Sequence, residues 1–123
     1  MNDRIENAIN EIEKSLNLKM LNLFNLGLTT QDLVYLFNLN QYKEFFVNLE
    51  VLDLQHNNLS TLPEKMLDKL VNLAILELQN NNLSTLPEKM LDNLVNLEEL
   101  YLDKSNLTLP EKIKNKKGLQ IYY

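Results

Sequence analysis

Few side chains in this sequence are of the types that carry out catalysis. His56 is the only histidine and there is no cysteine, which excludes a thiol nucleophile and a metal cluster of His and Cys ligands. A Ser/His/acid arrangement would need one of three serines near this histidine: Ser60, Ser84 or Ser105. Ser60 and Ser84, however, occupy the same place in two copies of one repeated phrase. We interpret them as scaffold residues, and His56 as a turn residue at the rim of a strand.

Acidic pairs and glycines add no catalytic site. The acidic pairs are Glu98 with Glu99 and Asp53 with Glu77. Neither pair has a partner base or a predicted deep pocket beside it. The chain has only two glycines, too few for a phosphate-binding loop. The sequence therefore predicts a protein that is not an enzyme and that uses no cofactor and no metal.

Composition narrows the class of protein. A chain of 123 residues suffices for one small domain. Its net charge of −5 and pI of 4.8 argue against binding to nucleic acid or to an anionic membrane, since both need clustered Lys and Arg. No apolar run reaches about 18 residues, and the opening MNDRIENAIN lacks the features of a secretion signal. We expect a soluble, cytoplasmic protein that favours a basic partner.

An eleven-residue phrase, NLSTLPEKMLD, occurs twice, at Asn58–Asp68 and at Asn82–Asp92. Aligning on it gives 24-residue units at 47–70 and 71–94, and a looser copy at 95–117. Each full unit begins with the pattern L-x-x-L-x-L-x-x-N-x-L. The residues in this pattern are Leu49, Leu52, Leu54, Asn57 and Leu59, then Leu73, Leu76, Leu78, Asn81 and Leu83.

This pattern resembles the leucine-rich repeat family, and the second half of each unit is similar to the typical class of 24-residue repeats. The resemblance extends from about residue 16 to the C-terminus. It implies an α/β fold, a curved right-handed solenoid with a parallel β-sheet on its concave face and short helices or 3-10 turns on its convex face. It also implies a non-enzymatic module that binds a protein or peptide through the concave face.

We divide the chain, as a single domain, into six segments. They are an N-terminal cap helix (1–16), an atypical repeat (16–46), two full repeats (47–70 and 71–94), a divergent repeat (95–117) and a terminal strand (118–123).

The residues of one unit support the same fold by themselves. In VLDLQ the apolar positions alternate, so Leu52 and Leu54 face one side of a strand and the intervening residues face the other. Pro63 is then expected at the first position of a short helical turn, from which Met66 and Leu70 face the interior. Because a proline recurs at this place in the three units from residue 47 onward, as Pro63, Pro87 and Pro110, a continuous helix or coiled coil is excluded.

Asn57 and Asn81 lie where the chain leaves each strand. We interpret them as structural, because their amides can satisfy backbone groups of adjacent turns that would cost about 1–3 kcal/mol each without partners. A ligand-binding row of asparagines is the alternative. The inward-pointing leucines that flank each asparagine disfavour it.

The N-terminal segment is predicted to be an amphipathic helix that covers the first unit. Asp3 with Glu6 fits a capping pair. Apolar residues follow at helical spacing. They are Ile5, Ala8, Ile9, Ile12 and Leu16. A membrane-surface helix is the alternative, but the polar face is acidic rather than rich in lysine.

The unit at 16–46 departs from the repeat pattern, because Leu26 stands where asparagine is expected. Its segment TTQDLVYLFN is predicted to be a helix capped by Thr29 or Thr30. Its leucines are read as the inward positions of the unit, Leu18, Leu21, Leu23, Leu26 and Leu28. We interpret its aromatic residues as filling a wider turn rather than forming an exposed binding surface. They are Tyr35, Phe37, Tyr42, Phe45 and Phe46.

The C-terminal end also departs from the pattern. Ser105 replaces the asparagine, and 118–123 is predicted to begin a further strand. The edge of that strand invites a symmetric dimer, so we expect a monomer or a weak homodimer, and self-association is our alternative function. Four lysines are interpreted as guards against such pairing rather than as a site for an acidic ligand. They are Lys112, Lys114, Lys116 and Lys117.

The outward strand positions carry the candidate partner-binding residues, because the core does not dictate them. The rows are Met20, Val51, Ile75 and Glu99; Asn22, Asp53, Glu77 and Tyr101; and Phe24, Gln55, Gln79 and Asp103. Ile121 and Tyr123 are expected to extend the first and second rows. Apolar side chains bordered by acids predict a partner of basic and apolar character. The alternative is that β-branched residues here only satisfy strand propensity.

Overall fold

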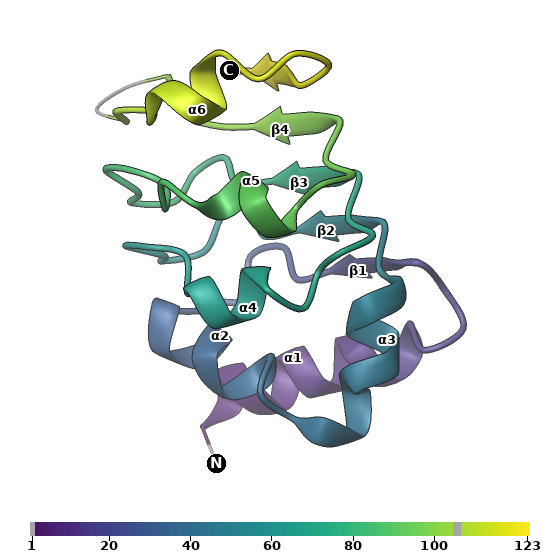
Figure 1. Cartoon of the computed structure of the whole chain (residues 1–123). Coiled ribbons are helices and arrows are strands. Elements are labelled where there is room, and N and C mark those ends of the chain that lie inside the picture. Colours follow the sequence, from purple (N-terminus) through teal and green to yellow (C-terminus); the bar gives the residue numbers. More distant parts are fainter. Residues whose placement is uncertain (1, 105–106) are drawn as a thin grey trace.

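Five short parallel strands form one open sheet in the computed structural model, which describes residues 2–104 and 107–123. The strands lie side by side in chain order, each one adjacent to the strand of the next unit (Figure 1). Their bounds are β1 Met20–Asn22, β2 Val51–Asp53, β3 Ile75–Glu77, β4 Glu99–Tyr101 and β5 Gln120–Tyr122. This order, with every connection leading to the neighbouring strand, is that of a solenoid.

Short helices connect the strands, and four of them stack in a row on the side away from the sheet (Figure 1). The connecting helices are α2 Thr30–Leu36, the 3-10 helix η1 Asn40–Tyr42, α3 Lys43–Asn48, α4 Glu64–Leu67, α5 Met90–Asn93 and α6 Glu111–Lys114. Helix α4 packs between α2 and α5, and α5 packs on α6. Each unit thus contributes one layer to both the sheet and the helical side.

The core lies between these two sides and is built from the repeated leucines. The middle residues of four adjacent strands are fully buried. The leucine two positions later is fully buried after the first two strands and almost fully buried after the other two. These residues are Leu21, Leu52, Leu76 and Leu100, then Leu23, Leu54, Leu78 and Leu102. Burial of one such side chain contributes about 1.5–3 kcal/mol. The predicted alternation of inward and outward positions is confirmed.

The register of β5 differs from the prediction. Ile121 pairs with Leu100 in the inward row and Tyr122 pairs with Tyr101, whereas we expected Ile121 and Tyr123 in the outward rows. The prediction aligned Leu119 with Leu97, but the connection before β5 is one residue shorter than that alignment requires. Because side chains alternate along a strand, a slip of one residue exchanges the two faces.

Helix α1 Asp3–Lys14 covers the end of the core beside β1, as predicted (Figure 1). Its buried residues are Ile5, Ala8 and Ile12. The expected capping pair is wrong, because the N-cap is Asn2, whose side-chain oxygen accepts a hydrogen bond from the Ile5 amide at 2.8 Å. Asp3 and Glu6 lie in the first turn instead, where their charge favours the helix dipole.

Two leucines predicted to face the core are exposed. Helix α1 ends at Lys14, so Leu16 lies beyond the apolar face and has 44% of its surface exposed. Leu18 is 56% exposed in the turn that leads to β1. Helical periodicity holds only within the helix, and strand alternation begins only at Met20.

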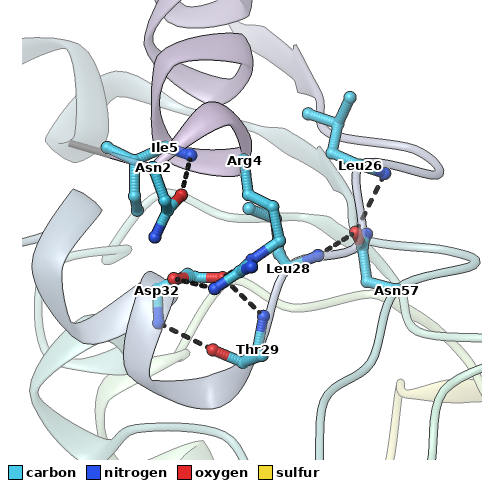
Figure 2. A network of polar contacts seen from close by, with 8 residues as sticks. All are labelled: Asn2, Arg4, Ile5, Leu26, Leu28, Thr29, Asp32 and Asn57. Atoms are coloured by element: carbon cyan, nitrogen blue, oxygen red, sulfur yellow. Dashed lines mark hydrogen bonds and ion pairs between the residues drawn. The ribbon is translucent and has the colours of Figure 1, made fainter.

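The unit at 16–46 folds around helix α2, which Thr29 caps as predicted. The Thr29 hydroxyl accepts from the Asp32 amide at 3.2 Å, and the Asp32 carboxylate accepts from the Thr29 amide at 2.9 Å. Arg4 of α1 donates to the same carboxylate at 2.8 Å, which ties the cap helix to this unit (Figure 2). Burial raises the pKa of Asp32, but the bonds from Arg4 and Thr29 outweigh it and leave this pKa below its usual value.

The aromatic residues of this unit are core residues, with one exception. Phe37, Tyr42, Phe45 and Phe46 are buried, and Phe37 packs on Phe46 with ring centroids 4.5 Å apart. Tyr35 differs, since 45% of its surface is exposed on α2. The prediction that most of the cluster fills the wider turn is therefore confirmed.

Pro63 precedes helix α4 rather than occupying its first position. It is the N-cap, with φ −67° and ψ 128°, and the helix begins at Glu64. The prediction placed Pro63 inside the helix, at its first position, but Pro63 is the capping residue just before it. An extended ψ suits a capping residue but not a residue inside the helix. Met66 and Leu70 are buried, as predicted.

Candidate partner-binding surface

Asn57 joins two successive turns of the solenoid through five hydrogen bonds. Its side-chain oxygen accepts from the amides of Leu26 at 3.1 Å and Leu28 at 2.9 Å (Figure 2). Its amide nitrogen donates to the carbonyl oxygens of Leu23, Leu54 and Gln55, at distances of 2.8, 3.0 and 3.2 Å. The structural interpretation of this residue is confirmed, because its amide is fully used inside the protein.

Asn81 repeats this arrangement one unit later. Its amide nitrogen donates to Leu54 at 2.9 Å and Leu78 at 3.0 Å, and its oxygen accepts from the Leu59 amide at 3.1 Å. The next residue in the series, Ser105, lies outside the described residues. The asparagines therefore belong to the scaffold, and partner binding must be sought elsewhere.

The strand register brings the predicted rows abreast on one face of the sheet. Met20, Val51, Ile75 and Glu99 form one row, and Asn22, Asp53, Glu77 and Tyr101 the next. Beyond the strands, the amides of Asn25 and His56 donate to the carbonyls of Gln55 and Gln79, each at 3.0 Å, which keeps the third row in parallel. We call these twelve outward residues the sheet face.

Aromatic side chains occupy both ends of the sheet face. At the β1 end, Phe24 lies edge-on to His56 with ring centroids 5.0 Å apart, and Phe24 and Met20 have 44% and 49% of their surfaces exposed. At the other end, Tyr101 stacks on Tyr122 with centroids 4.7 Å apart and an interplanar angle of 17°. Val51 and Ile75 lie half-buried between these ends.

Tyr122 and Gln120 are outward residues that the sequence prediction missed. Gln120 lies beside Glu99, and Tyr122 lies beside Tyr101. The prediction placed Ile121 and Tyr123 outward and so left Tyr122 inward. Taking Ile121 as the inward residue would have found both, because the residues on either side of an inward position face outward.

Comparison with known proteins agrees with this geometry. The family model described as leucine rich repeat matches residues 47–107. The chain belongs to the leucine-rich repeat family. No curated protein matches it. Leucine-rich repeat domains generally mediate protein–protein interactions and are typically not enzymes.

The carboxylates of this leucine-rich repeat protein are not equivalent. Asp103 accepts from the Asn80 amide with both oxygens, each at 2.9 Å, so it takes the place of a backbone carbonyl of a further turn. Asp53 accepts from the Gln55 amide at 2.9 Å, and Glu99 accepts from the Tyr101 hydroxyl at 2.7 Å. These three predicted contact residues thus have partners within the repeats.

Glu77 lies at the centre of the sheet face, and its carboxylate makes no hydrogen bond or ion pair with residues 2–104 or 107–123, whereas its backbone carbonyl accepts from the Leu54 amide at 2.9 Å. Burial raises its pKa, and so does repulsion from Asp53 and Glu99. On the neighbouring strand, the hydrogen bond to Glu99 raises the pKa of Tyr101 to about 12, with burial and nearby negative charges acting in the same direction. Negative charge is therefore concentrated around Glu77, where a cation would be favoured.

Metal-binding groups and membrane-spanning helices also bear on function. Among the described residues, no three His, Asp or Glu side chains gather as a possible metal site. In the same parts of the chain, no helix has the length and apolar character needed to cross a membrane.

His56 sits in a left-handed turn with φ 56°, and its ring lies 2.9 Å from the Asn80 side-chain nitrogen. This position agrees with the predicted turn residue.

Proposed function

We propose that the protein is a non-enzymatic binding module whose concave sheet face holds a protein or peptide segment of basic and apolar character. The observation that carries this proposal is the unpaired carboxylate of Glu77 among half-exposed apolar side chains. A cation from a partner would relieve the repulsion that Asp53 and Glu99 exert on it. The acidic face also disfavours nucleic acid and anionic membranes, and we propose a cytoplasmic location.

Partly exposed side chains on a sheet can also reflect strand propensity alone. That explanation accounts for Val51 and Ile75, which are β-branched, but not for Met20 or Phe24, the two most exposed apolar side chains of the predicted rows. It also gives no reason for a carboxylate beside two other acids. Contact with a partner explains all of these features together, since interfaces combine apolar anchors with a polar rim.

The test is a pull-down from the native cell lysate with a triple variant of the sheet face. Val51→Ala, Ile75→Ala and Tyr101→Ala together should abolish capture of the partner. The matched control carries Val34→Ala, Tyr35→Ala and Val71→Ala, which remove similar exposed side chains away from the sheet. We expect this control to capture the same partner as the unmodified chain.

The interpretation needs both variants to be folded, which circular dichroism checks. If the folded sheet-face variant still captures the partner, or if the control loses it equally, the proposal is contradicted. A partner that binds only the sheet face is then identified by mass spectrometry. We expect it to present Lys or Arg next to apolar residues.

Self-association through β5 is the second candidate. In the described parts of the chain, β5 pairs with β4 on one side only, and Tyr123 beside it is 67% exposed. An unpaired strand edge can add the same strand of a second copy. Light scattering at high micromolar concentration separates the candidates, because a monomer there contradicts self-association and leaves the binding module unaffected.

A further inference from the structure

The sheet face has two chemically different halves. The apolar half consists of Met20 on β1, Phe24 two residues beyond the end of β1, and Val51 on β2. The tyrosine–carboxylate half lies on β3, β4 and β5 and consists of Glu77, Glu99, Tyr101 and Tyr122. A partner that uses both halves needs two different side chains at a defined separation. This separation constrains the partner beyond the basic and apolar character already proposed.

The tyrosine–carboxylate half suits a guanidinium group better than an ammonium group. Tyr122 stacks on Tyr101 and remains 43% exposed, so an aromatic surface is available beside the carboxylates. Glu77 lies abreast of Tyr101, at the strand spacing of about 4.8 Å. Arginine can stack on an aromatic ring and bind a carboxylate through two parallel N–H donors at once, which lysine cannot do.

The spacing of the strands gives the distance between the apolar half and the tyrosine–carboxylate half of the sheet face. β1 and β4 are three strand intervals apart, which is about 14 Å. In an extended peptide four residues span about 13 Å, and side chains four positions apart point the same way. In an α-helix the same two positions are only about 6 Å apart. An extended segment therefore matches the sheet face, with its apolar residue and its cation four positions apart.

We propose that the partner segment is extended, crosses the strands from β1 to β4, and carries an apolar side chain four residues from an arginine. The apolar side chain packs on Met20 and Phe24, and the arginine lies against the tyrosines with its guanidinium on Glu77. This inference rests on the proposed function and specifies the partner of the same surface. The segment can run in either direction, because the sheet face sets the separation of the two side chains and not their order.

Selection from a phage-displayed library of random peptides of about twelve residues tests both the proposed function and the proposed partner segment. The full chain is the bait, and the triple variant of the sheet face removes unspecific binders. We expect the selected peptides to share an arginine and an apolar residue four positions apart. If no peptide prefers the unmodified chain, the proposed function fails and this inference with it. If peptides are selected without that pair, only this inference fails.

Synthetic versions of one selected peptide then test each determinant by fluorescence anisotropy. Replacing its arginine by lysine should weaken binding about fivefold, because stacking and the second hydrogen bond are lost. Moving the arginine by one position should weaken it at least as much, because the side chain then points away from the sheet. Equal binding of the arginine and lysine peptides, or no dependence on spacing, overturns the inference.

A matched pair of protein variants tests whether the arginine of the peptide binds at Glu77. Glu77→Gln should weaken the arginine peptide about fivefold, which is the upper range for a partly exposed ion pair. Glu88→Gln makes the same change of net charge at an exposed site between the third strand and α5, and it should leave binding unchanged. Equal effects of the two variants would mean that net charge alone attracts the peptide, which contradicts the inference.

Discussion

The two identical phrases at 58–68 and 82–92 do not have identical structures. In the first copy the helix begins at Glu64, directly after Pro63, whereas in the second it begins at Met90, three residues after Pro87. Leu59 is fully buried, but its counterpart Leu83 is only partly buried. The same holds for Leu67 and Leu91.

The neighbouring units account for this difference. The first copy packs against α2 of the long unit at 16–46, where the Thr30 hydroxyl donates to the Thr61 carbonyl at 2.8 Å and accepts from the amides of Ser60 and Thr61. The second copy precedes the divergent unit at 95–117, which is one residue shorter in its loop. A repeat thus takes its final form from the units on either side of it.

Paired leucine variants should show the largest effect. Leu59→Ala is expected to lower the free energy of unfolding by about 4 kcal/mol, because a fully buried side chain leaves a cavity. Leu83→Ala should cost about half as much, since its side chain is already partly exposed. Urea unfolding measures both values. Equal losses would show that the two copies are equally packed in solution.

The asparagines that precede the two copies should differ less. Asn57→Ala removes hydrogen bonds to two amides and three carbonyls and should cost about 3 kcal/mol. Asn81→Ala removes hydrogen bonds to one amide and three carbonyls, and we expect a loss of about 2 kcal/mol. The urea midpoints of the two variants give the comparison. If Asn81→Ala were the more destabilising variant, that result would contradict the second amide hydrogen bond assigned to Asn57.

Acidic residues at equivalent places in the two repeats should respond with opposite signs. Asp53→Ala is expected to cost about 1 kcal/mol, because it removes the carboxylate oxygen that accepts from both nitrogens of Gln55, one on the backbone and one on the side chain. Glu77→Gln should instead stabilise the protein by about half a kcal/mol at neutral pH, since it removes a carboxylate repelled by its neighbours.

The pH dependence checks the sign for Glu77. Its pKa in the folded protein lies above that in the unfolded chain, so its protonated form favours folding. The stability that protonation provides is complete below the unfolded pKa and is lost as the pH rises through the folded pKa. Melting temperatures of Glu77→Gln and the unmodified chain should therefore differ at neutral pH and converge in acid. A constant difference would contradict the raised pKa.

The smallest expected change in stability concerns the residue that follows each copy. Lys69 donates to the Phe37 carbonyl, at the end of α2, whereas the equivalent Asn93 donates to Asp68 at an exposed position. Lys69→Met keeps the aliphatic chain and should cost about half a kcal/mol. Asn93→Ala should be close to neutral, because its hydrogen-bond partner Asp68 is exposed. Thermal melts of the two variants resolve this difference.

Much of the fold follows from residue types and spacing. The alternation of Leu52 and Leu54 and the asparagines at 57 and 81 each have one local solution, so β1 to β4, the turns that follow them and most of the core were predictable. The first residue of α4 and the register of β5 were not. The cap helix over the first unit was predictable for the same reason, and Thr29 is one of the two residues, with Thr30, that the sequence offered as the N-cap of α2. Errors occurred where a local rule had two candidates, as with Asn2 and Asp3 at the first N-cap.

The sheet face was predictable as a set of positions but not as a set of interactions. Sequence alternation placed Glu77, Asp103 and Tyr101 outward. It could not show that Asp103 binds the Asn80 amide or that Tyr101 pairs with Glu99, while Glu77 has no partner among the described residues. Those differences arise between units about 24 residues apart, where no spacing rule acts.

By itself, the sequence determined that each unit is a strand followed by a short helical segment, and that leucines face inward. This follows because alternation, proline geometry and asparagine hydrogen bonding act over a few residues. Only the tertiary structure decided the register of β5, the packing difference between Leu59 and Leu83, and the isolation of Glu77. These features depend on contacts between successive turns, and identical phrases diverge because those contacts differ.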